Sequence, residues 1–266
     1  MIGGEDMKTK YPIVLVHGIV IKDFLFIKSF GEIDRILRIQ GHTVYKANID
    51  GVGSVANNAV QLKNEILKIL EKENVDKVNV IAHSKGGLDT KYMIEHLGME
   101  DHVASLTTLS TPHKGSPIAT NILKLPKWIT KFIAFWVNFW YRLFGDKKPN
   151  SYQACLDLQR IDSLEEATIN FSNKVYCQSY STEMKKSRDD FIMGIPLMFS
   201  KHFEKNQISD GVVPQDSTVF GEYKGHAFDE SVSHSEIIDF MVKKKKKDKI
   251  YMFYSFLCEE LVNMGF

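Results

Sequence analysis

Residues 77–87 read KVNVIAHSKGG, and this stretch decides the fold. Its first six residues form a mostly apolar run, which is typical of a strand buried inside a sheet. Ser84 follows that run, Gly86 permits a sharp turn of the backbone, and the pattern then becomes helical. A strand, a serine in a tight turn and a helix together make a nucleophile elbow, which raises the serine hydroxyl above the edge of the sheet.

The elbow departs from its usual form, G-x-S-x-G, because Ala82 stands where the first glycine is usual. Alanine is still small enough for close packing at that corner. An alternative is that Ser84 is an ordinary N-cap of the helix, a position in which serine is common. The apolar strand before Ser84 and the helix after it favour the elbow, so we take Ser84 as the candidate nucleophile.

Similar apolar runs recur through the first half of the chain, at residues 11–16, 43–47 and 103–109. Helical patterns lie between them, over residues 61–70 and 88–97. This alternation predicts an α/β fold, with a mostly parallel central sheet and helices on both faces. In the second half we expect a helix, a strand and a last helix, at residues 152–175, 175–180 and 249–262.

An oxyanion hole is expected beside the elbow. His17, Gly18 and Ile19 follow the first predicted strand, and Gly18 would let the chain approach a substrate oxygen closely. Alone, this would be a simple glycine turn at the end of a strand. Together with the elbow, it predicts that the backbone N–H groups of Ile19 and Lys85 are the two oxyanion donors.

The remaining catalytic partners are sought after Ser84, because folds with this elbow place the acid and then the histidine later in the chain. His234 lies in the polar loop SVSHSE and is the expected base. Asp210, in ISDGVV, is the expected acid that orients the imidazole. Asp229 is a rival because it is nearer to His234 in sequence, and Asp210 could be part of a plain D-G turn.

Charge and cysteine content argue against nucleic-acid-binding and disulfide-rich proteins. The chain has 266 residues, with 34 Lys plus Arg against 33 Asp plus Glu, and this near-balance argues against nucleic-acid binding. Cys155, Cys177 and Cys258 are too few and too widely spaced for a zinc motif or a disulfide framework, so we expect free thiols. Residues 1–10 lack a signal-peptide pattern, so we expect a cytoplasmic protein or export by another route.

Four segments resemble the bacterial true triacylglycerol lipases of the α/β-hydrolase superfamily. They are YPIVLVHG, KVNVIAHSKGGLDTKY, VASLTTLSTPHKGSPIA with its specific T-P-H-x-G-S element, and SDGVV with the later SVSHSEIID. The likeness is nearly continuous over residues 11–119 and patchy to about residue 239. It implies an α/β-hydrolase fold with a helical lid, an ester hydrolase activity, and a triad of Ser84, Asp210 and His234.

The resemblance also bears on cofactors. Members of this family often hold a structural calcium near the histidine loop, bound by carboxylates and an amide. Here Glu236 stands where an aspartate is usual, and Phe240 stands where the amide would be. These two departures argue against the calcium, and we expect no cofactor.

A very apolar, aromatic stretch is the candidate lid. Trp128, Phe132, Trp136 and Trp140 fall at four-residue spacing and indicate an amphipathic helix. The stretch is too short and too charged to span a membrane. We expect one domain, residues 1–266, with a lid insertion at residues 120–151 that carries these substrate-binding or lid residues. The lid is expected to cover the substrate pocket and to open at lipid surfaces, where its aromatic face is buried in the interface. The alternative is a helix fixed in the core.

A run of lysines at residues 243–247 is the one compositionally odd segment. It could contact anionic lipid head groups, although a solvated loop or helix end is the simpler interpretation. The sequence favours a triacylglycerol lipase that acts on acyl esters through an acyl-enzyme intermediate. A short-chain carboxylesterase, a phospholipase, a thioesterase or an acyltransferase would use the same residues, and a catalytically silent lipid-binding protein is the rival from another class.

Overall fold

The computed structural model describes residues 8–19, 28–159, 174–190, 193–194, 197–198 and 207–266. Six described strands form one sheet in the order β2-β1-β3-β4-β5-β6, and every neighbouring pair is parallel. The strands are β1 Ile13–Val16, β2 Val44–Lys46, β3 Val78–His83, β4 Val103–Leu109, β5 Tyr176–Ser181 and β6 Glu222–His226. Because all run the same way, their carboxyl ends meet at one edge, where α/β folds place their sites.

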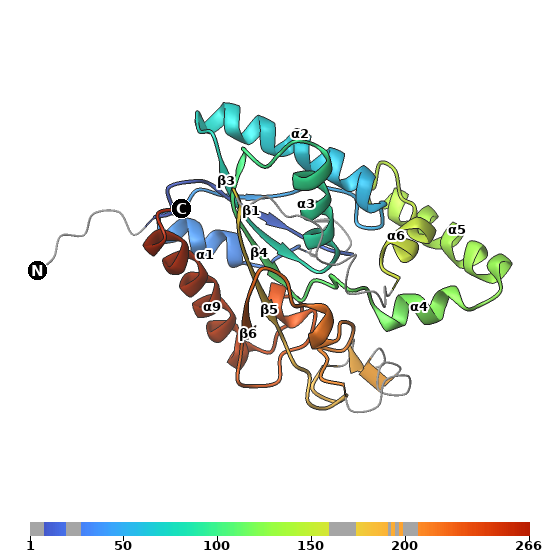
Figure 1. Ribbon diagram of the computed structural model, residues 1–266. Coiled ribbons are helices and arrows are strands. Elements are labelled where there is room, and N and C mark those ends of the chain that lie inside the picture. Colours follow the sequence, from blue (N-terminus) through green and yellow to red (C-terminus); the bar gives the residue numbers. More distant parts are fainter. Residues whose placement is uncertain (1–7, 20–27, 160–173, 191–192, 195–196, 199–206) are drawn as a thin grey trace, which may run out of the picture.

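Helices cover both faces of the sheet (Figure 1). α2 (Val55–Glu73) and α3 (Lys85–His96) lie on one face, and α1 (Ile33–Ile39) and α9 (Lys244–Asn263) lie on the other. Successive side chains of β1 enter different cores, since Ile13 and Leu15 pack toward α1 and α9 while Val14 and Val16 pack toward α2 and α3. The continuous apolar run at residues 11–16 therefore reflects burial on both faces.

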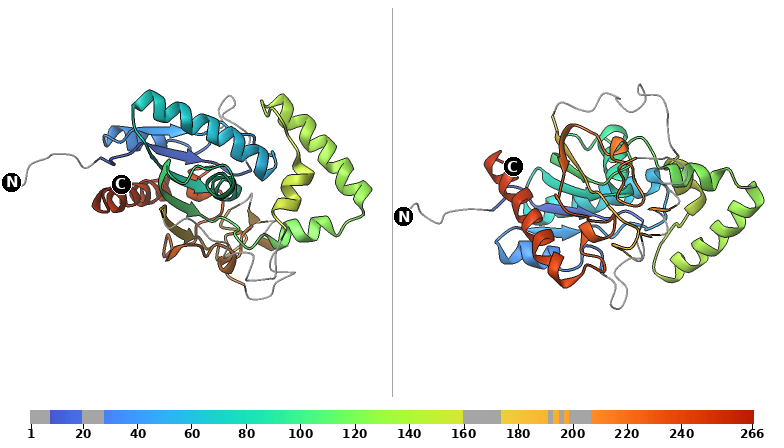
Figure 2. Two further views of the ribbon diagram at one scale, coloured as in Figure 1. Left: turned by 45° about the horizontal axis from the view of Figure 1, so that its top comes forward. Right: turned by 90° about the horizontal axis from the view of Figure 1, so that it is seen from below.

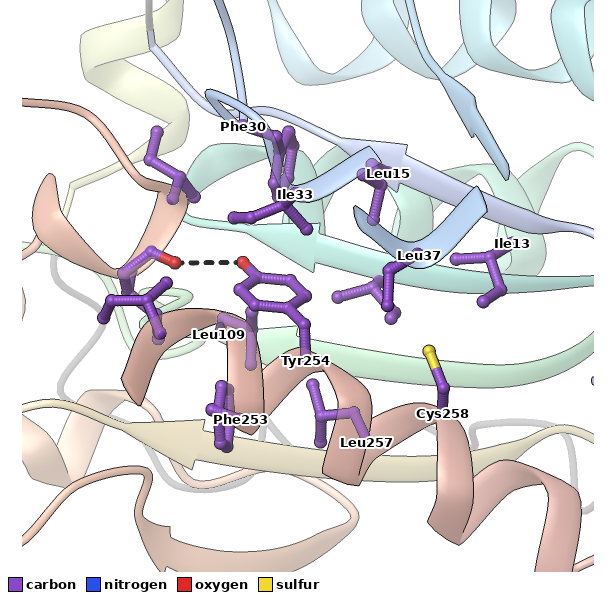
Figure 3. Close-up of a cluster of buried hydrophobic side chains, with 14 of the residues drawn as sticks. Ile13, Leu15, Phe30, Ile33, Leu37, Leu109, Phe253, Tyr254, Leu257 and Cys258 are labelled. Carbon is purple, nitrogen blue, oxygen red and sulfur yellow. Dashed lines mark hydrogen bonds between the residues drawn. The ribbon is translucent and has the colours of Figure 1, made fainter. Parts of the chain in front are cut away.

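The core beneath α9 is fixed by an aromatic pair (Figure 3). The ring of Tyr254 meets that of Phe30 edge to face, with 6.4 Å between centroids. The Tyr254 hydroxyl donates to the carbonyl oxygen of Ile237 at 3.1 Å, and burial raises its pKa well above the ordinary value. The last helix therefore packs on the sheet and also bonds the loop that follows His234.

Three helices project beyond the carboxyl edge of the sheet and stand apart from the layers described above (Figure 2). They are α4 (Pro117–Leu123), α5 (Lys127–Leu143) and α6 (Ser151–Asp157), and they contact one another. The expected insertion at residues 120–151 falls within this group. Its movement as a lid stays a prediction. None of the helices in the described part of the chain is long and apolar enough to cross a membrane.

Two buried carboxylates tie the end of α5 to the loop after β2. The carboxylate of Asp50 accepts from the backbone N–H groups of Lys147 and Lys148, both at 2.7 Å. In return, the carboxylate of Asp146 accepts from the backbone N–H groups of Gly51 and Val52, both at 3.0 Å. Charge-assisted bonds of this kind are about twice as strong as neutral ones, so this end of the projecting layer is anchored to the main body.

The structure confirms the α/β fold class with its mostly parallel sheet, and it refines several boundaries. The last helix begins at Lys244 rather than residue 249, so most of the lysine run is helical. Of the expected helix at 152–175, only α6 is described, and residues 160–173 lie outside the described chain. The three cysteines are free, as expected.

Truncation of the α9 core should cost stability. Leu257 is fully buried, so Leu257→Ala should lower the free energy of unfolding by about 2–5 kcal/mol through lost burial and a residual cavity. Chemical denaturation monitored by circular dichroism measures this change. Met252→Ala, at an exposed site on the same helix, should change the stability by less than about 0.5 kcal/mol. Equal losses in the two variants would contradict this account of the core.

Candidate active site

Ser84 sits in a strained turn between β3 and α3. Its backbone has φ 54° and ψ −132°, a combination that a residue with a side chain rarely adopts. Two hydrogen bonds hold it, because the Ser84 N–H donates to the Leu109 carbonyl at 3.0 Å and the Thr111 hydroxyl donates to the Ser84 carbonyl at 2.9 Å. The expected elbow geometry is present at this position.

Three glycines allow the main chain to close around this turn. A Cβ on Gly18 would lie 2.6 Å from the Cβ of Ser84, and a Cβ on Gly86 would lie 2.4 Å from the carbonyl oxygen of His17. A Cβ on Gly87 would lie 2.2 Å from the hydroxyl of Thr111. The H-G pair after β1 and the S-x-G-G turn therefore fit against each other only because side chains are missing on both sides.

The structure brings Ser84, His234 and Asp210 into one hydrogen-bonded relay. His234 Nε2 lies 2.9 Å from Ser84 Oγ, and His234 Nδ1 lies 2.7 Å from Asp210 Oδ2. All three residues are buried, and Asp210 is only 1% exposed. With the Nδ1 proton directed at the carboxylate, Nε2 is free to accept the serine proton, which is the arrangement that activates a serine hydroxyl.

Asp210 is held by its own turn. Its Oδ1 accepts from the backbone N–H groups of Val212 and Val213 at 3.0 and 2.8 Å, while its backbone carbonyl accepts from the N–H of His234 at 3.0 Å. The D-G turn and the acid are thus the same feature. Asp210, rather than the exposed Asp229, is the carboxylate that accepts from His234.

The two expected oxyanion donors lie beside the serine. Lys85 is the first residue of α3, so its N–H has no acceptor within the helix. The position of a Cβ on Gly18 is 3.1 Å from that nitrogen, which places the loop after β1 directly against it. Ile19 lines the same cavity as Ser84 and His234. The donor role of these N–H groups stays a prediction.

A buried ion pair that the sequence analysis did not predict lies within the helix that follows the elbow. The Lys85 ammonium donates to Asp89 at 2.7 Å, with both side chains 1% exposed, and the Asn58 amide donates to the other oxygen of Asp89 at 3.0 Å. Burial raises the pKa of Asp89 to about 6, and Lys85 opposes that rise. No sequence motif indicated this pair. Lysine and aspartate four residues apart occur on many helices, so the spacing carries no specific signal.

Two further histidines, His83 and His113, are buried and pack against other rings. The ring of His83 lies 4.5 Å from that of His234 between centroids, and burial followed by repulsion from His234 holds the pKa of His83 well below its ordinary value. His113 stacks on Phe220, and burial lowers its pKa to about 3. Both rings therefore stay neutral, and His83 packs against the base without adding charge to the site.

An apolar cavity of about 410 Å³ opens onto Ser84 and His234. Its walls come mainly from the projecting helices, through Ile118, Ile122, Leu123, Ile133, Ala134 and Val137. Such a space suits a hydrocarbon chain and offers few partners to a polar group.

The four aromatic residues named for the expected lid lie on the outer side of α5. Trp128, Phe132, Trp136 and Trp140 do not line this cavity, and 73%, 61%, 47% and 53% of their surfaces are exposed. The cavity side of α5 carries the smaller Thr130, Ala134 and Val137 instead. The four-residue spacing groups the aromatic residues on one face, and that face is turned outward. Its burial at a lipid surface stays a prediction.

The residues after His234 do not fit the calcium that the resemblance implies. Both carboxylate oxygens of Glu236 accept from the ammonium group of Lys246, at 2.9 and 2.7 Å. Phe240 offers no side-chain oxygen at the position of the amide. Across the described ranges, no group of three or more His, Cys, Asp and Glu side chains is arranged to hold a metal ion.

A side chain at Gly18, where the loop after β1 approaches Ser84, should disable the site. Gly18→Ala should lower kcat/KM on a soluble ester by about 100-fold, because the new methyl group must push the H-G loop away from Ser84 and Lys85. Steady-state kinetics on the folded variant measures this. Ala82→Gly restores the common elbow residue and should retain activity within a few-fold. Wild-type rates in Gly18→Ala would mean that this close approach has no catalytic role.

Known proteins are similar to this chain. Residues 52–182 match the family model of the PGAP1-like alpha/beta domain. Triacylglycerol lipase 2 of Saccharomyces cerevisiae is 27% identical over 275 residues, covering 92% of this chain and 76% of the yeast protein. The triacylglycerol lipase of Burkholderia plantarii is 31% identical over 172 residues, covering 61% of this chain and 48% of its own. The chain thus spans about half the length of that bacterial relative.

Solved structures agree on the fold. The Staphylococcus hyicus lipase superimposes with a TM-score of 0.69 at 15% identity, covering 96% of this chain and 97% of its own. The Bacillus licheniformis lipase BlEst2 in mature form gives 0.62 at 20% identity, covering 92% and 91%. The parallel sheet, the strained elbow and these likenesses together show an α/β-hydrolase fold, and they support the resemblance to the lipases of that superfamily.

Proposed function

We propose that this protein is a serine lipase that hydrolyses carboxylic esters of fatty acids, with triacylglycerols as the preferred substrate class. One observation carries the proposal: the relay Ser84–His234–Asp210 ends at the mouth of an apolar cavity. The relay supplies a nucleophile and the cavity supplies a place for an acyl chain. The names of the relatives point to the same chemistry.

The proposed reaction has two halves. His234 takes the hydroxyl proton of Ser84 as the serine oxygen attacks the ester carbonyl, and the N–H groups of Lys85 and Ile19 stabilise the oxyanion. His234 then gives the proton to the departing alcohol, which leaves an acyl group on Ser84. A water molecule, deprotonated by His234, attacks this acyl-enzyme and releases the fatty acid. Asp210 keeps the imidazole oriented and stabilises its charged form throughout.

The cavity favours acyl chains over small polar esters. Its lining is aliphatic on the α4 and α5 sides, where a hydrocarbon would replace water against Ile118, Ile122 and Val137. Each buried methylene contributes about 0.8 kcal/mol, so several methylenes give a large preference over an acetyl group. This argues against the short-chain carboxylesterase. The complete relay argues against a silent lipid-binding protein, which has no use for a serine held at φ 54°.

A series of p-nitrophenyl esters from acetyl to palmitoyl tests the proposal. We expect kcat/KM to rise from acetyl toward medium or long chains, because each added methylene enters the apolar cavity. Ser84→Ala should reduce turnover of every ester by at least about 10⁴-fold, since no other group forms the acyl-enzyme. Activity confined to acetyl and butyryl would favour the carboxylesterase, and turnover by Ser84→Ala would exclude Ser84 as the nucleophile.

The second part of the proposal is that the outer face of α5 contacts lipid surfaces. On this helix the large side chains are exposed and the small ones are buried, the reverse of a helix packed in a core. We define the outer face by its exposed apolar residues: Trp128, Phe132, Phe135, Trp136, Phe139, Trp140 and Leu143. A contiguous apolar face of this kind marks an interaction surface.

The charges around the outer face favour an anionic surface. Residues 117–149 include exposed cations at Lys124, Lys127, Lys131, Arg142, Lys147 and Lys148. Their one acid, Asp146, is buried against backbone N–H groups. Two copies of the chain would bring like charges together here, whereas anionic lipid head groups would neutralise them. The walls of the cavity come mainly from the same projecting helices, so docking would place the cavity near lipid substrate.

Co-sedimentation with ether-lipid vesicles, which an ester hydrolase cannot cleave, tests the surface separately from turnover. We expect vesicles of phosphatidylcholine with phosphatidylglycerol to bind the protein, and added salt to weaken the binding. Phe132→Ala with Trp136→Ala should reduce the partition coefficient by about tenfold or more, because two exposed rings leave the interface. Met252→Ala, exposed on α9, serves as the control. Binding that ignores both rings and lipid charge would exclude this surface.

A further inference from the structure

The lysine run at the start of α9 conflicts with local helix energetics. Helix N-termini carry a partial positive charge and favour acidic side chains, yet the first turn of α9 has no acid and several lysines. Residues that break a local rule in this way usually satisfy a contact elsewhere. Three of these lysines bond the segments around the catalytic loop: Lys243 donates to the Asp189 carbonyl at 3.1 Å, and Lys246 and Lys247 pair with carboxylates.

Lys246 makes the most buried of these contacts. Its ammonium donates to Glu236 Oε1 and Oε2 at 2.9 and 2.7 Å, and to the carbonyl oxygen of Ser231 at 2.7 Å. These three acceptors match the three N–H donors of an ammonium group. The side chains of Lys246 and Glu236 are only 11% and 4% exposed, so the pair is shielded from water.

Glu236 in turn bonds to Ser233, the residue before His234. Its Oε2 accepts from the N–H of Ser233 at 3.1 Å, while its own N–H donates to the hydroxyl of Ser233 at 3.2 Å. This reciprocal pair is a capping box, S-x-x-E, and His234 is the residue directly after its serine. Two bonds between Ser233 and Glu236 therefore close the backbone around His234, and the carboxylate that makes one of them is neutralised by Lys246.

A second pair braces the end of the same loop. Asp239 has φ 58°, and its buried carboxylate lies 3.1 Å from the ammonium of Lys247. The other oxygen of Asp239 accepts from the N–H of Glu32 at 3.0 Å and from the hydroxyl of Tyr251 at 2.9 Å. Adjacent lysines of one helix thus hold two carboxylates, one two residues after His234 and one five residues after it.

We propose that Lys246 is a positioning residue for His234 and supplies the cation of the histidine loop, where the family resemblance implies a calcium ion. The ammonium of Lys246 occupies both oxygens of Glu236, so the geometry of the relay does not depend on a divalent metal. This inference rests on the proposed role of His234 as the base. On this inference, lysines of the run support the active site rather than contact lipid.

Removal of Lys246 should act on the chemical step. In Lys246→Met the Glu236 carboxylate is left buried without its cation, and the loop must move to hydrate it. That movement shifts the imidazole, which now lies 2.9 Å from Ser84 and 2.7 Å from Asp210. We expect kcat on a soluble ester to fall about 10- to 100-fold with KM within about twofold, since misplacement near 1 Å has such effects.

Matched variants separate positioning from general destabilisation. Lys246→Arg keeps a cation and should recover most of the lost kcat, with a pH profile near that of the wild type. Lys249→Met removes a lysine of the same helix whose partner, Glu230, forms an exposed pair with it, and should leave kcat unchanged. If Lys246→Met does not fold, Lys246→Met with Glu236→Met removes both charges, and the folded double variant should still have low kcat.

Two further measurements decide the proposal. The low-field proton resonance of the Asp210–His234 hydrogen bond should shift or broaden in Lys246→Met and return in Lys246→Arg, whatever the substrate class of the enzyme. EDTA should leave the melting temperature and kcat of the wild type unchanged. Wild-type kcat and an unaltered resonance in folded Lys246→Met would overturn the inference, as would loss of stability in EDTA that calcium restores. Failure of a fluorophosphonate to label wild-type Ser84 would instead count against the proposed function.

Discussion

The active site depends on one backbone conformation, the positive φ of Ser84. A serine at φ 54° is stable only where its surroundings over-determine it, and here they do so from three directions. Leu109 and Thr111 bond its N–H and carbonyl from β4 and the loop after it. The backbone of Gly18 packs directly against the Cβ of Ser84, which only a residue without a side chain allows. Because β1, β3 and β4 are neighbouring parallel strands, all three supports arise at one edge of the sheet.

Beyond the sheet, the loops around the site are fixed largely by buried carboxylates. Asp50 and Asp146 tie the projecting helices to the loop after β2, and Asp210 orders its own turn through two backbone N–H groups. Glu236 and Asp239 do the same for the loop of His234, with lysines as their counter-charges. Loops have little apolar surface to bury, so charge-assisted bonds to the backbone replace packing as their source of rigidity.

The sequence predicts the sheet, the elbow and the relay well because each leaves a local signal. Buried strands give apolar runs, and Ser84, Asp210 and His234 each lie in a short motif with a fixed order along the chain. The Lys246–Glu236 pair left no such signal, since it joins two segments that become neighbours only after folding. The lysine run was visible, but its partners were not, so solvation was the simpler interpretation.

The orientation of α5 shows a different limit of sequence patterns. A hydrophobic stripe normally marks the buried side of a helix, so the sequence pattern alone left open a helix fixed in the core. Both sides of α5 are apolar, however, and only the size of the side chains differs. The cavity needs room for a substrate, which small residues such as Thr130 and Ala134 provide and tryptophan would fill. Large rings would fill the cavity, so on this helix they lie on the exposed side, where the proposed function gives them a lipid surface to contact.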